Sequence, residues 1–347
     1  MNENLKEHRM TPSRFRSLTK KYRQLRIAVV GDFCLDRYLE IDPLRKEVSL
    51  ETGLPVHNVV RIRGQAGGAG TIVNNLAALG VREILPIGFA GDDGEGFELQ
   101  RALASLPGVQ MESFVLTAER RTFTYAKPLI ISHNRAPQEL NRFDSKNWTP
   151  TPMSLQRRLS DSVRKIARKI DAIIVMDQVD VAETGVVTRR MLRTISEVRR
   201  EIPSLLILAD SRRDLRNFPT VGFKMNRAEL SRLLGRAISV HETPMVAAAL
   251  ARKTGNYCFV TLANKGLLGA GPDGAGERVA ALPVRGEIDV VGAGDCVTAN
   301  LIAALAAGAT LREALQLANA AASVVVHKLG TTGTASVAEI RSLLFPD

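Results

Sequence analysis

Short apolar runs alternate with amphipathic helical stretches along most of this chain, and this alternation restricts the possible folds more than any other feature. Runs such as "RIAVVGD", "DAIIVMD" and "SLLILAD" predict strands buried on both faces, because they lack the polar alternation of a half-exposed strand. Between them, "LQRRLSDSVRKIARKI" and "TRRMLRTISEVRR" predict amphipathic helices. Strands that alternate with helices predict a parallel sheet covered on both faces, so we expect an α/β protein.

The middle of the chain departs from this pattern. Between Met111 and Asp144 lie β-favouring pieces such as "RRTFTYAKPLIIS", which predict small strands away from the main sheet. The 347 residues show no internal repeat, low-complexity tract or interdomain linker. We therefore expect one large domain with a small β appendage.

Several protein classes are disfavoured by composition. The most apolar helical region, near Leu301–Leu311, is short and broken by glycine, so no membrane span is expected. The first residues lack an apolar signal core, which disfavours secretion. Cys34, Cys258 and Cys296 lie far apart and the five histidines are scattered. We therefore expect no disulfide framework, no transition-metal site and a cytoplasmic location.

The net charge of +11 raises the question of a nucleic-acid partner, but the charge is uneven. Residues 1–26 hold eight basic and two acidic side chains, a net charge of +6. Neither a zinc-finger spacing nor an RNA-binding aromatic signature accompanies them, so we expect no nucleic-acid partner. The favoured interpretation is a solvated basic leader over residues 1–25, and weak association with acidic surfaces is the alternative.

Polar residues follow several of the predicted strands directly: Asp32, Asp177, Asp210, Asn226 and Thr261. Each alone is typical of a turn or a helix cap. Together they predict one polar edge, because ligands of open α/β sheets bind beyond the carboxyl ends of the strands.

The stretch "VGAGDCVTANLIAALAAG" places Gly292, Ala293 and Gly294 directly before Asp295 and an apolar helix. Small residues at a helix N-terminus expose backbone N–H groups to an anion. Asp295 as a plain helix cap is one interpretation. A dinucleotide fingerprint is disfavoured, because the third glycine is absent. Phosphoryl transfer is the third interpretation: the carboxylate would accept the proton of an attacking hydroxyl placed in line with the bound phosphate.

The chain has no Gly-x-x-x-x-Gly-Lys-Ser/Thr loop, which excludes a P-loop enzyme. Instead, "DVVGAGD" resembles the C-terminal signature of the ribokinase-like (PfkB) carbohydrate kinases. "GGAGTIVNNLAALG", "KMNRAEL", "VTLANKGLL" and "LANAAASVVVHKLGTTGT" resemble further elements of that family, in the family's order. The resemblance implies a three-layer sandwich with a mostly parallel central sheet. It places the kinase domain at residues 26–347, with β lid segments near 37–62 and 111–145.

Within the family, "GDFCLDRY", "SLETGLPV" and "NRFD" are similar to kinases of D-glycero-D-manno-heptose 7-phosphate. The resemblance therefore implies transfer of the γ-phosphate of ATP to a hydroxyl of a sugar or sugar phosphate, with heptose 7-phosphate as one candidate acceptor. Fructose phosphates, ribose and nucleosides are the alternatives. It also implies Mg²⁺, a monovalent cation such as K⁺ in many relatives, and a homodimer formed through the lid.

The family motifs assign roles to positions of this chain. The expected base is Asp295, with Gly292, Ala293 and Gly294 as the anion hole. The expected acceptor residues are Asp36, Gly67, Gly68, Thr71, Arg121, Lys127 and Arg142. The expected nucleotide-side residues are Asn226, Glu229, Thr261, Gly266, Asn319, Lys328, Gly330 and Thr331, and the expected metal-site residues are Glu229 for Mg²⁺ and Asp289 for the monovalent cation.

Structural roles remain open for several of these residues. Glu229 would serve equally as a first-turn helix acid, and Asp289 would serve equally to stabilise its loop by hydrogen bonding. Asn319 would fit a polar helix face, and the lid cations a solvated surface.

The chain also departs from the family pattern. Thr71 replaces a sugar-binding asparagine, Ala263 a glycine of the nucleotide turn, and Val291 a threonine. "MDQVDVAETG" stands where the heptose kinases carry a tyrosine-alanine-lysine-glycine run. These changes leave the acceptor open.

Two other classes remain possible from the sequence. A nucleotide-linked oxidoreductase would use "GQAGGAG" as its dinucleotide fingerprint, although "PIGFAGDD" stands where the following strand should end in an acid. A binding protein that has lost turnover would bind ADP without phosphorylating a sugar, and the intact Asp295 argues against it.

Overall fold

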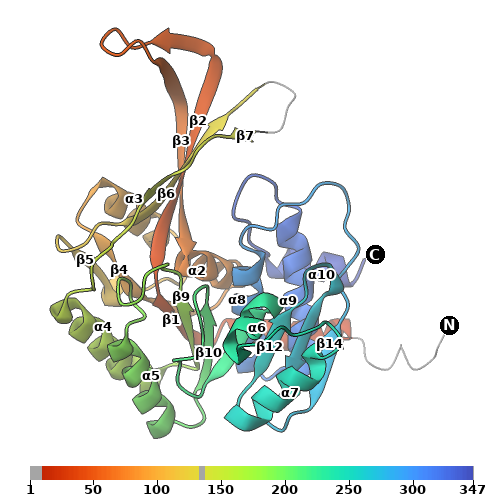
Figure 1. Cartoon of the computed structure of the whole chain (residues 1–347). Coiled ribbons are helices and arrows are strands. Elements are labelled where there is room, and N and C mark those ends of the chain that lie inside the picture. The colour runs from red at the N-terminus through yellow and green to blue at the C-terminus, as the bar shows by residue number, and fades with distance from the viewer. Residues whose placement is uncertain (1–9, 133–136, 347) are drawn as a thin grey trace.

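A nine-stranded sheet forms the centre of the molecule (Figure 1). The computed structural model describes residues 10–132 and 137–346. The strand order is β14-β13-β12-β11-β10-β9-β1-β4-β5, with antiparallel pairing only where β13 meets β12 and β14. The strands are β1 (Arg26–Gly31), β4 (Glu83–Gly91), β5 (Phe114–Thr117), β9 (Ala172–Asp177), β10 (Leu206–Ser211), β11 (Gly222–Asn226), β12 (Cys258–Thr261), β13 (Leu267–Ala270) and β14 (Gly276–Val279).

Helices cover both faces of this sheet. They are α1 (Pro12–Tyr22), α2 (Ala69–Ala78), α3 (Gly94–Ala104), α4 (Met153–Ile166), α5 (Arg189–Glu201), α6 (Arg227–Leu234), α7 (Thr243–Thr254), α8 (Ala293–Ala306), α9 (Leu311–Val326) and α10 (Val337–Leu344). Short 3₁₀ turns occupy Met111–Ser113, Ala167–Lys169 and Ala263–Lys265.

The alternation of side chains along the strands divides the interior into two cores. Ile27 and Val29 of β1 face the core built with α1, α2, α8 and α9. Ala28 and Val30 face the core built with α4, α5 and α7. A strand covered on both faces must be apolar at every position, which explains the uninterrupted apolar runs of the sequence. The expected three-layer α/β architecture is confirmed.

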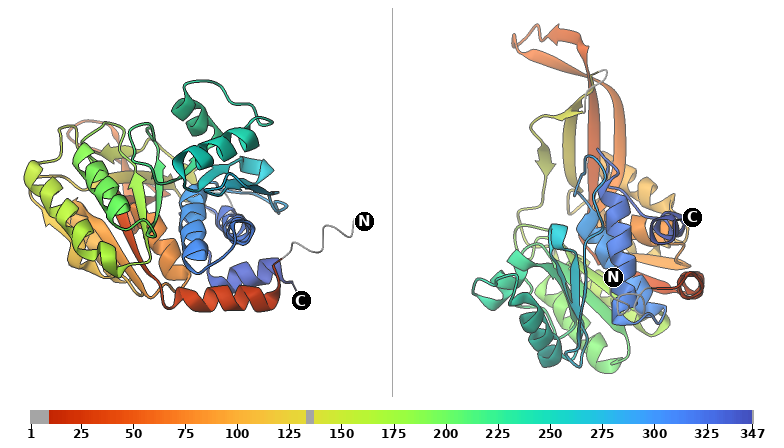
Figure 2. Two further views of the ribbon diagram at one scale, coloured as in Figure 1. Left: turned by 90° about the horizontal axis from the view of Figure 1, so that it is seen from below. Right: turned by 90° about the vertical axis from the view of Figure 1, so that its right-hand side faces the viewer.

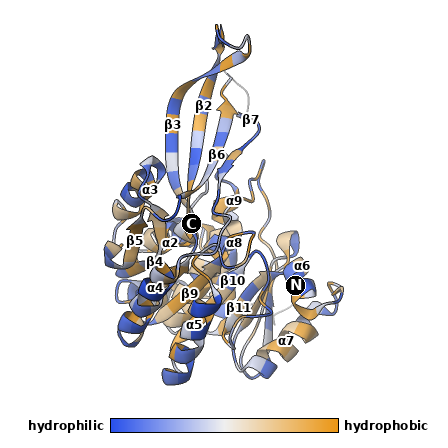
Figure 3. Cartoon of the chain, turned by 60° about the vertical axis from the view of Figure 1, so that its left-hand side comes forward, coloured by the Kyte–Doolittle hydropathy of each residue, from blue (hydrophilic) through white to orange (hydrophobic). Residues whose placement is uncertain are grey.

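A second, five-stranded sheet forms the β lid and extends away from the body as a long arm (Figure 1). It contains β2 (Phe33–Val48), β3 (Pro55–Gly68), β6 (Phe123–Ile130), β7 (Gln138–Glu139) and β8 (Phe143–Ser145). In Figure 3, apolar and polar residues mix along this arm.

The lid differs in extent from the sequence prediction. Its first two strands run from residue 33 to residue 68 rather than from 37 to 62. Within the predicted second segment, β5 pairs with β4 and extends the main sheet, because its Phe114 and Val115 are buried there.

Helix α1 corrects the prediction of a solvated leader. Phe15, Leu18 and Tyr22 are buried in the main core. The rings of Phe15 and Phe345 lie 5.6 Å apart, and Figure 2 shows α1 alongside the C-terminal helices. The basic residues lie on the exposed side of this helix, whereas the spacing of the three apolar residues marks one buried helix face. Residues 1–9 of the predicted leader lie outside the described residues.

Among the described residues, no helix is both long and apolar enough to span a bilayer.

Candidate active site

The predicted anion-binding residues, called the anion seat below, form the N-terminus of α8 (Gly292–Gly294). Gly292 caps the helix with a φ of +79°, a conformation that L side chains rarely adopt. A Cβ at this position would lie 2.6 Å from Cγ2 of Thr332. Gly294, two residues further along, would carry its Cβ 3.1 Å from Nζ of Lys224. The small residues of this motif therefore let the backbone approach Thr332 and Lys224 closely.

Asp295 lies in the first turn of α8 and is only 6% exposed. Burial raises the pKa of its carboxyl group from 3.8 to about 6. Arg212 and Lys224 oppose this rise, whereas Asp210 and Asp36 add to it. A carboxylate with this pKa is ionised at neutral pH and is a stronger base than an ordinary aspartate, as a general base requires.

Lys224 is a functional candidate that the sequence analysis missed. Its Nζ forms a buried ion pair with Asp210 Oδ2 at 2.7 Å, and Thr298 of α8 donates to the same oxygen at 3.0 Å. Burial alone would lower the pKa of Lys224, but the nearby carboxylates, Asp210 first among them, together outweigh burial and the pKa is raised, so the ammonium is charged. The sequence signal for this residue is a lysine inside the apolar strand "GFKMN", since a buried lysine needs a partner.

The acceptor-side residues that the sequence proposed come together where the lid joins the body. Asp36 of β2 pairs with Lys127 Nζ of β6 at 2.9 Å. A Cβ on Gly67 would collide with the Asp36 carboxylate, so only glycine allows this approach. Gly68 has a φ of +58° and leads directly into α2.

Thr71, in the first turn of α2, connects the acceptor side to the anion seat. Its Cγ2 lies 3.5 Å from the place of a Cβ on Gly292. The carboxylate of Asp36, the glycines of β3 and the N-terminus of α8 therefore lie close together.

Of the two lid arginines predicted on the acceptor side, Arg142 is paired and Arg121 is exposed. Arg142 pairs with Asp144 at 2.6 Å and lies over the ring of Tyr125 at 4.8 Å. The side chain of Arg121 is exposed, while its backbone exchanges two hydrogen bonds with the Asn147 side chain. Lys127 is paired with Asp36, as described above. Two of the three predicted lid cations are therefore already neutralised by aspartates.

On the nucleotide side, Asn226 and Glu229 form a reciprocal capping box at the start of α6. Asn226 Oδ1 accepts from the Glu229 backbone N–H at 2.9 Å, and Glu229 Oε2 accepts from the Asn226 backbone N–H at 2.7 Å. Thr261 of β12 is the register partner of Asn226. The structure thus places these residues together at the sheet edge and gives the first two a structural role as well.

The turn after β12 explains two positions of the nucleotide-side motif. Gly266 has a φ of +92°, and a Cβ there would collide with the backbone carbonyl of Val279. Ala263, which replaces a family glycine, also has a positive φ, of 50°. Alanine in this left-handed conformation costs about 1 kcal/mol relative to glycine.

We expect Ala263→Gly to stabilise the protein by about 0.5–1 kcal/mol, because the native backbone there already suits glycine. Urea unfolding of the variant and the parent protein measures this difference. Ala275→Gly, in the exposed turn before β14, is the control that changes composition without relieving a positive φ. An equal or lower stability of Ala263→Gly would contradict the expectation.

Two other predicted residues have partners within the protein, and a third, Gly330, lies in an open turn. Asn319 Nδ2 donates to the carbonyl of Ala280 at 2.9 Å, which ties α9 to the segment after β14. Lys328 pairs with Glu339 at 2.6 Å. Gly330 has a φ of +66° and no atoms near the position of a Cβ.

Thr331 and Asp289 help to shape the loops around the site. Thr331 Oγ1 accepts from Gln65 Nε2 of β3 at 2.7 Å, so this loop meets the lid. Asp289 Oδ1 accepts from the Val291 backbone N–H at 3.0 Å, and the backbone N–H of Asp289 donates to the carbonyl of Val326. Across the described residues, no cluster of three or more His, Cys, Asp or Glu side chains forms a metal site.

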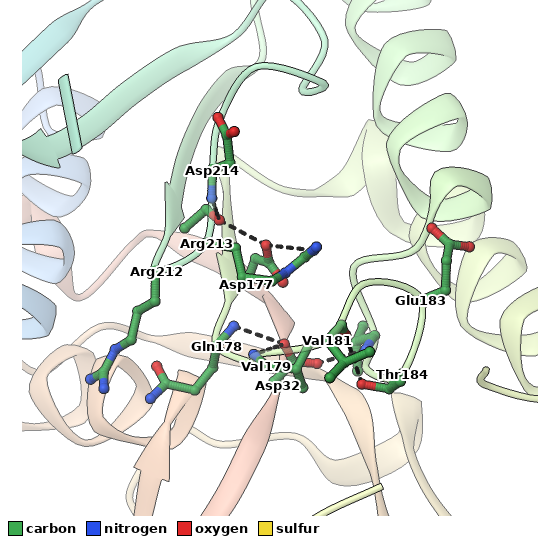
Figure 4. A network of polar contacts seen from close by, with 12 residues as sticks. Asp32, Asp177, Gln178, Val179, Val181, Glu183, Thr184, Arg212, Arg213 and Asp214 are labelled. Atoms are coloured by element: carbon green, nitrogen blue, oxygen red, sulfur yellow. Dashed lines mark hydrogen bonds and ion pairs between the residues drawn. The ribbon is translucent and has the colours of Figure 1, made fainter. Parts of the chain in front are cut away.

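Asp32 and Asp177 form a buried network instead of an open polar edge (Figure 4). Asp32 accepts from the backbone N–H groups of Gln178, Val179 and Val186. Asp177 Oδ2 accepts from Ser211 Oγ at 2.7 Å and from Arg213 at 2.9 Å. Burial and the nearby Asp32 raise the pKa of Asp177 to about 7. These two aspartates therefore hold the loop that follows β9.

The "GQAGGAG" stretch ends the lid strand β3 and opens α2. A dinucleotide fingerprint requires a parallel strand of the main sheet before the helix. This arrangement removes the oxidoreductase interpretation.

Comparisons with known proteins agree with this architecture. The chain resembles the ribokinase of Arabidopsis thaliana solved with ribose and ATP, with a TM-score of 0.67, 18% identity and coverage of 93% of this chain and 99% of that one. It also resembles the Escherichia coli phosphofructokinase-2 solved with potassium, with a TM-score of 0.69, 18% identity and coverage of 92% and 98%. The fold is therefore ribokinase-like.

Sequence comparison gives the family. The model of the pfkB family carbohydrate kinases matches residues 25–338. The chain is 30% identical over 335 residues to the "Bifunctional protein HldE" of Bradyrhizobium sp. (strain ORS 278), and 31% identical over 335 residues to that of Hyphomonas neptunium. Each match covers 96% of this chain and 66% of the relative, so the chain spans about two thirds of their length. The chain belongs to the pfkB family of carbohydrate kinases, and its reaction class is phosphoryl transfer to a hydroxyl acceptor.

Proposed function

We propose that this kinase transfers the γ-phosphate of ATP to a hydroxyl group of a sugar or sugar phosphate. The observation that carries the proposal is the buried Asp295, with its raised pKa, in the first turn of the helix whose glycine-rich N-terminus forms the anion seat. A helix N-terminus stabilises negative charge on phosphate, and a nearby base activates a hydroxyl. Phosphate stabilisation and hydroxyl activation at the same place are what a transfer of a phosphoryl group to a hydroxyl requires.

The proposed step uses this geometry directly. The acceptor oxygen attacks the γ-phosphorus, and its proton passes to the Asp295 carboxylate. The bond between the γ-phosphorus and the oxygen bridging to the β-phosphate breaks, and ADP leaves with the electron pair. Backbone N–H groups at Gly292–Gly294 stabilise the charge on the transferring group.

Two cations next to Asp295 support the same step. Lys224 Nζ lies beside Gly294, and the Asp210 pair holds its charge in place. Arg212, at the end of β10, lowers the pKa of Asp295 and is exposed. We assign both to the phosphates of the nucleotide or of the transition state.

Mg²⁺ would neutralise phosphate oxygens of bound ATP. Mg²⁺ keeps several of its waters and needs only one or two protein carboxylates. Glu229 fits such a water-mediated role. Its Oε2 accepts from the Asn226 backbone N–H, whereas its Oε1 has only a 3.9 Å contact with Arg232, and the side chain retains 17% exposure. A monovalent cation such as K⁺ is proposed near Asp289, whose Oδ1 alone receives a hydrogen bond within the described residues. Turnover measured with and without K⁺ tests this second site.

Heptose 7-phosphate is one acceptor to test, because the curated relatives are bifunctional HldE proteins. Fructose phosphates, ribose and nucleosides are the alternatives, since the chain departs from the heptose kinases at Thr71 and at residues 176–185. The decisive experiment is acceptor-dependent ADP release from Mg·ATP across this panel. Turnover with one acceptor supports the proposal and identifies the substrate. ADP binding without turnover for any acceptor would favour the alternative, a nucleotide-binding protein that has lost its activity.

We also propose a homodimer formed through the lid. The tip of the β2–β3 arm exposes Leu44, Val48, Leu50 and Leu54, with Leu50 fully exposed. Exposed apolar side chains gathered on one arm are typical of an interface.

Replacing Leu50 and Leu54 together by aspartate is expected to convert a dimer into a monomer, because charge at the centre of an apolar contact is costly. Light scattering after size-exclusion chromatography measures the mass. The pair Leu234→Asp and Met245→Asp, on the body, is the control. A mass that is already monomeric, or unchanged by the lid substitutions, would contradict this arrangement.

We place the protein in a reducing compartment such as the cytoplasm. Its three cysteines are buried and unpaired, so no disulfide stabilises the described part of the fold.

A further inference from the structure

A large positive charge lies on α4 and α5, two helices that cover the same face of the main sheet. Residues 153–169, which are α4 and the 3₁₀ turn that extends it, hold six basic side chains and one acidic side chain. Helix α5 holds five basic and two acidic side chains, so the net charge of the two segments is +8. The N-terminal leader carries +6, and the pair of helices is therefore a second and larger concentration of positive charge.

The two helices form one continuous surface. Their apolar sides are buried in the same core beneath them. Two ion pairs join them, Arg164 to Glu197 at 2.9 Å and Arg168 to Glu201 at 3.5 Å. In Figure 1, α4 and α5 lie side by side on the outside of the molecule, and in Figure 3 both carry many hydrophilic residues.

The acidic side chains of this surface neutralise only part of its charge. Asp161, the third acid, lies 3.0 Å from Arg164, which already pairs with Glu197. All three acids are thus engaged by only two arginines. Six exposed cations, which we call the basic face, form no ion pair within the described part of the chain: Arg157, Arg158, Lys165, Lys169, Arg193 and Arg200. Like charges held close together repel one another, so a partner that neutralises them must be anionic.

The shape of the basic face favours a planar anionic partner. Helix α4 has 14 residues and is therefore about 21 Å long. Both helices pack against the sheet along their whole length, so neither projects as a helix that enters a nucleic-acid groove does. No residue of 153–169 or of α5 is aromatic, so unpaired bases would find no side chain on which to stack.

Two exposed apolar side chains lie at the N-terminal end of α4. Met153, its first residue, is 49% exposed, and Trp148, five residues earlier, is 68% exposed. Tryptophan is favoured at the level of lipid headgroups, because its ring is largely apolar and its N–H can remain in water. A basic surface with an exposed tryptophan at its end therefore fits an anionic lipid surface better than a nucleic acid.

We propose that the basic face is a docking surface for a membrane that contains anionic lipids. The inference goes beyond the proposed kinase function and does not depend on it. The six cations neutralise anionic headgroups, while Trp148 and Met153 enter the headgroup region at one end. The chain remains on the surface, because the apolar sides of α4 and α5 stay in the protein core.

The first test is flotation of the whole chain with lipid vesicles. Binding is expected for vesicles that mix phosphatidylglycerol with phosphatidylcholine, and not for phosphatidylcholine alone. It should be lost at high salt, because the Debye length falls from about 30 Å at 0.01 M to about 3 Å at 1 M. Equal binding to both kinds of vesicle, or none at low salt, would overturn the inference. Tighter binding to duplex DNA or RNA at the same phosphate concentration would assign the face to nucleic acid instead. Each of these failures leaves the proposed kinase function intact.

The second test removes half of the basic face with Arg158→Gln, Lys165→Gln and Arg193→Gln in one variant. Each cation near an anionic membrane contributes about fivefold to binding, so affinity for the mixed vesicles is expected to fall about 100-fold. These residues lie outside the proposed active site, so turnover in solution and the midpoint of thermal unfolding should be unchanged.

The matched control removes the same charge from exposed positions at α1, with Arg16→Gln, Lys20→Gln and Arg23→Gln. The apolar side of α1 belongs to the other core, so these positions lie across the main sheet from the basic face. The control variant is expected to keep most of its vesicle binding. An equal loss in both variants would show that binding follows net charge rather than the basic face, and would overturn the inference.

The third test uses Trp148, the only tryptophan of the chain, as a fluorescent probe. Its emission is expected to shift to shorter wavelength as the mixed vesicles bind, because the ring leaves water. The same titration at high salt is the control and should give no shift. Unchanged emission at saturating vesicle concentration would overturn the choice of a lipid surface as the partner.

Discussion

Asp295→Asn is expected to lower acceptor-dependent turnover by about 10²- to 10⁴-fold, the range that a general base contributes. Asparagine keeps the size of the side chain but cannot accept the proton of the acceptor hydroxyl. The anion seat at Gly292–Gly294 is unchanged, so ATP binding should persist. Coupled ADP release measures turnover, and calorimetric titration with ATP measures binding. Asp161→Asn, which removes an exposed carboxylate on α4, is the control.

The pH dependence gives an independent check on this role. Because the pKa of Asp295 is about 6, kcat/KM of the wild-type protein is expected to fall about tenfold per pH unit below pH 6. Above that value the base is ionised and the rate should level off. An acid limb near pH 4 would show that the base that controls the reaction has an ordinary carboxyl pKa, which would contradict the raised pKa of Asp295.

The stability of Asp295→Asn shows whether its lost turnover reflects the missing base or a damaged fold. The pKa of Asp295 is raised from 3.8 to about 6, so the folded state binds this proton more tightly than the unfolded chain. The stability from this group is therefore present below pH 3.8 and is lost as the pH rises through 6. Asp295→Asn removes that loss, and the variant should be at least as stable as the parent at pH 7.5. A much lower midpoint of thermal unfolding would mean that the inactivity reflects misfolding.

Lys224→Met is expected to destabilise the protein by about 3–5 kcal/mol, because it leaves the buried carboxylate of Asp210 without its cation. Thr298 still donates to that carboxylate, but a hydroxyl does not neutralise it. Turnover should also fall by about 10²-fold, the effect of removing one preorganised donor to a developing anion. Urea unfolding and ADP release measure the two effects.

The double variant Lys224→Met, Asp210→Asn distinguishes stability from catalysis. Neutralising Asp210 removes the unpaired buried charge, so most of the lost stability should return. The positive charge beside Gly294 stays absent, so turnover should remain low. Recovery of both properties would show that Lys224 serves the fold alone.

Much of the architecture follows from local patterns in the chain. The apolar runs and amphipathic stretches predict the main strands and helices, because periodicity records which side chains are buried. The anion seat is local as well, since Gly292 and Asp295 are only three residues apart. Composition alone gave the wrong prediction for the N-terminal helix. Its many charges suggested a solvated segment, although Phe15, Leu18 and Tyr22 form a buried face.

The partners of the site residues depend on tertiary structure. Lys224 meets Asp210 across neighbouring strands, and Lys127 meets Asp36 between two strands of the lid. Gln65 donates to Thr331 over 266 positions of sequence.

Local patterns were sufficient to predict the α/β fold class and the order of the main elements, because periodicity and turn residues depend on positions close together in the chain. The pairing of cations such as Lys224 and Lys127 is visible only in the tertiary structure. Burial and pairing depend on distances between segments remote in sequence, and no local pattern encodes those distances.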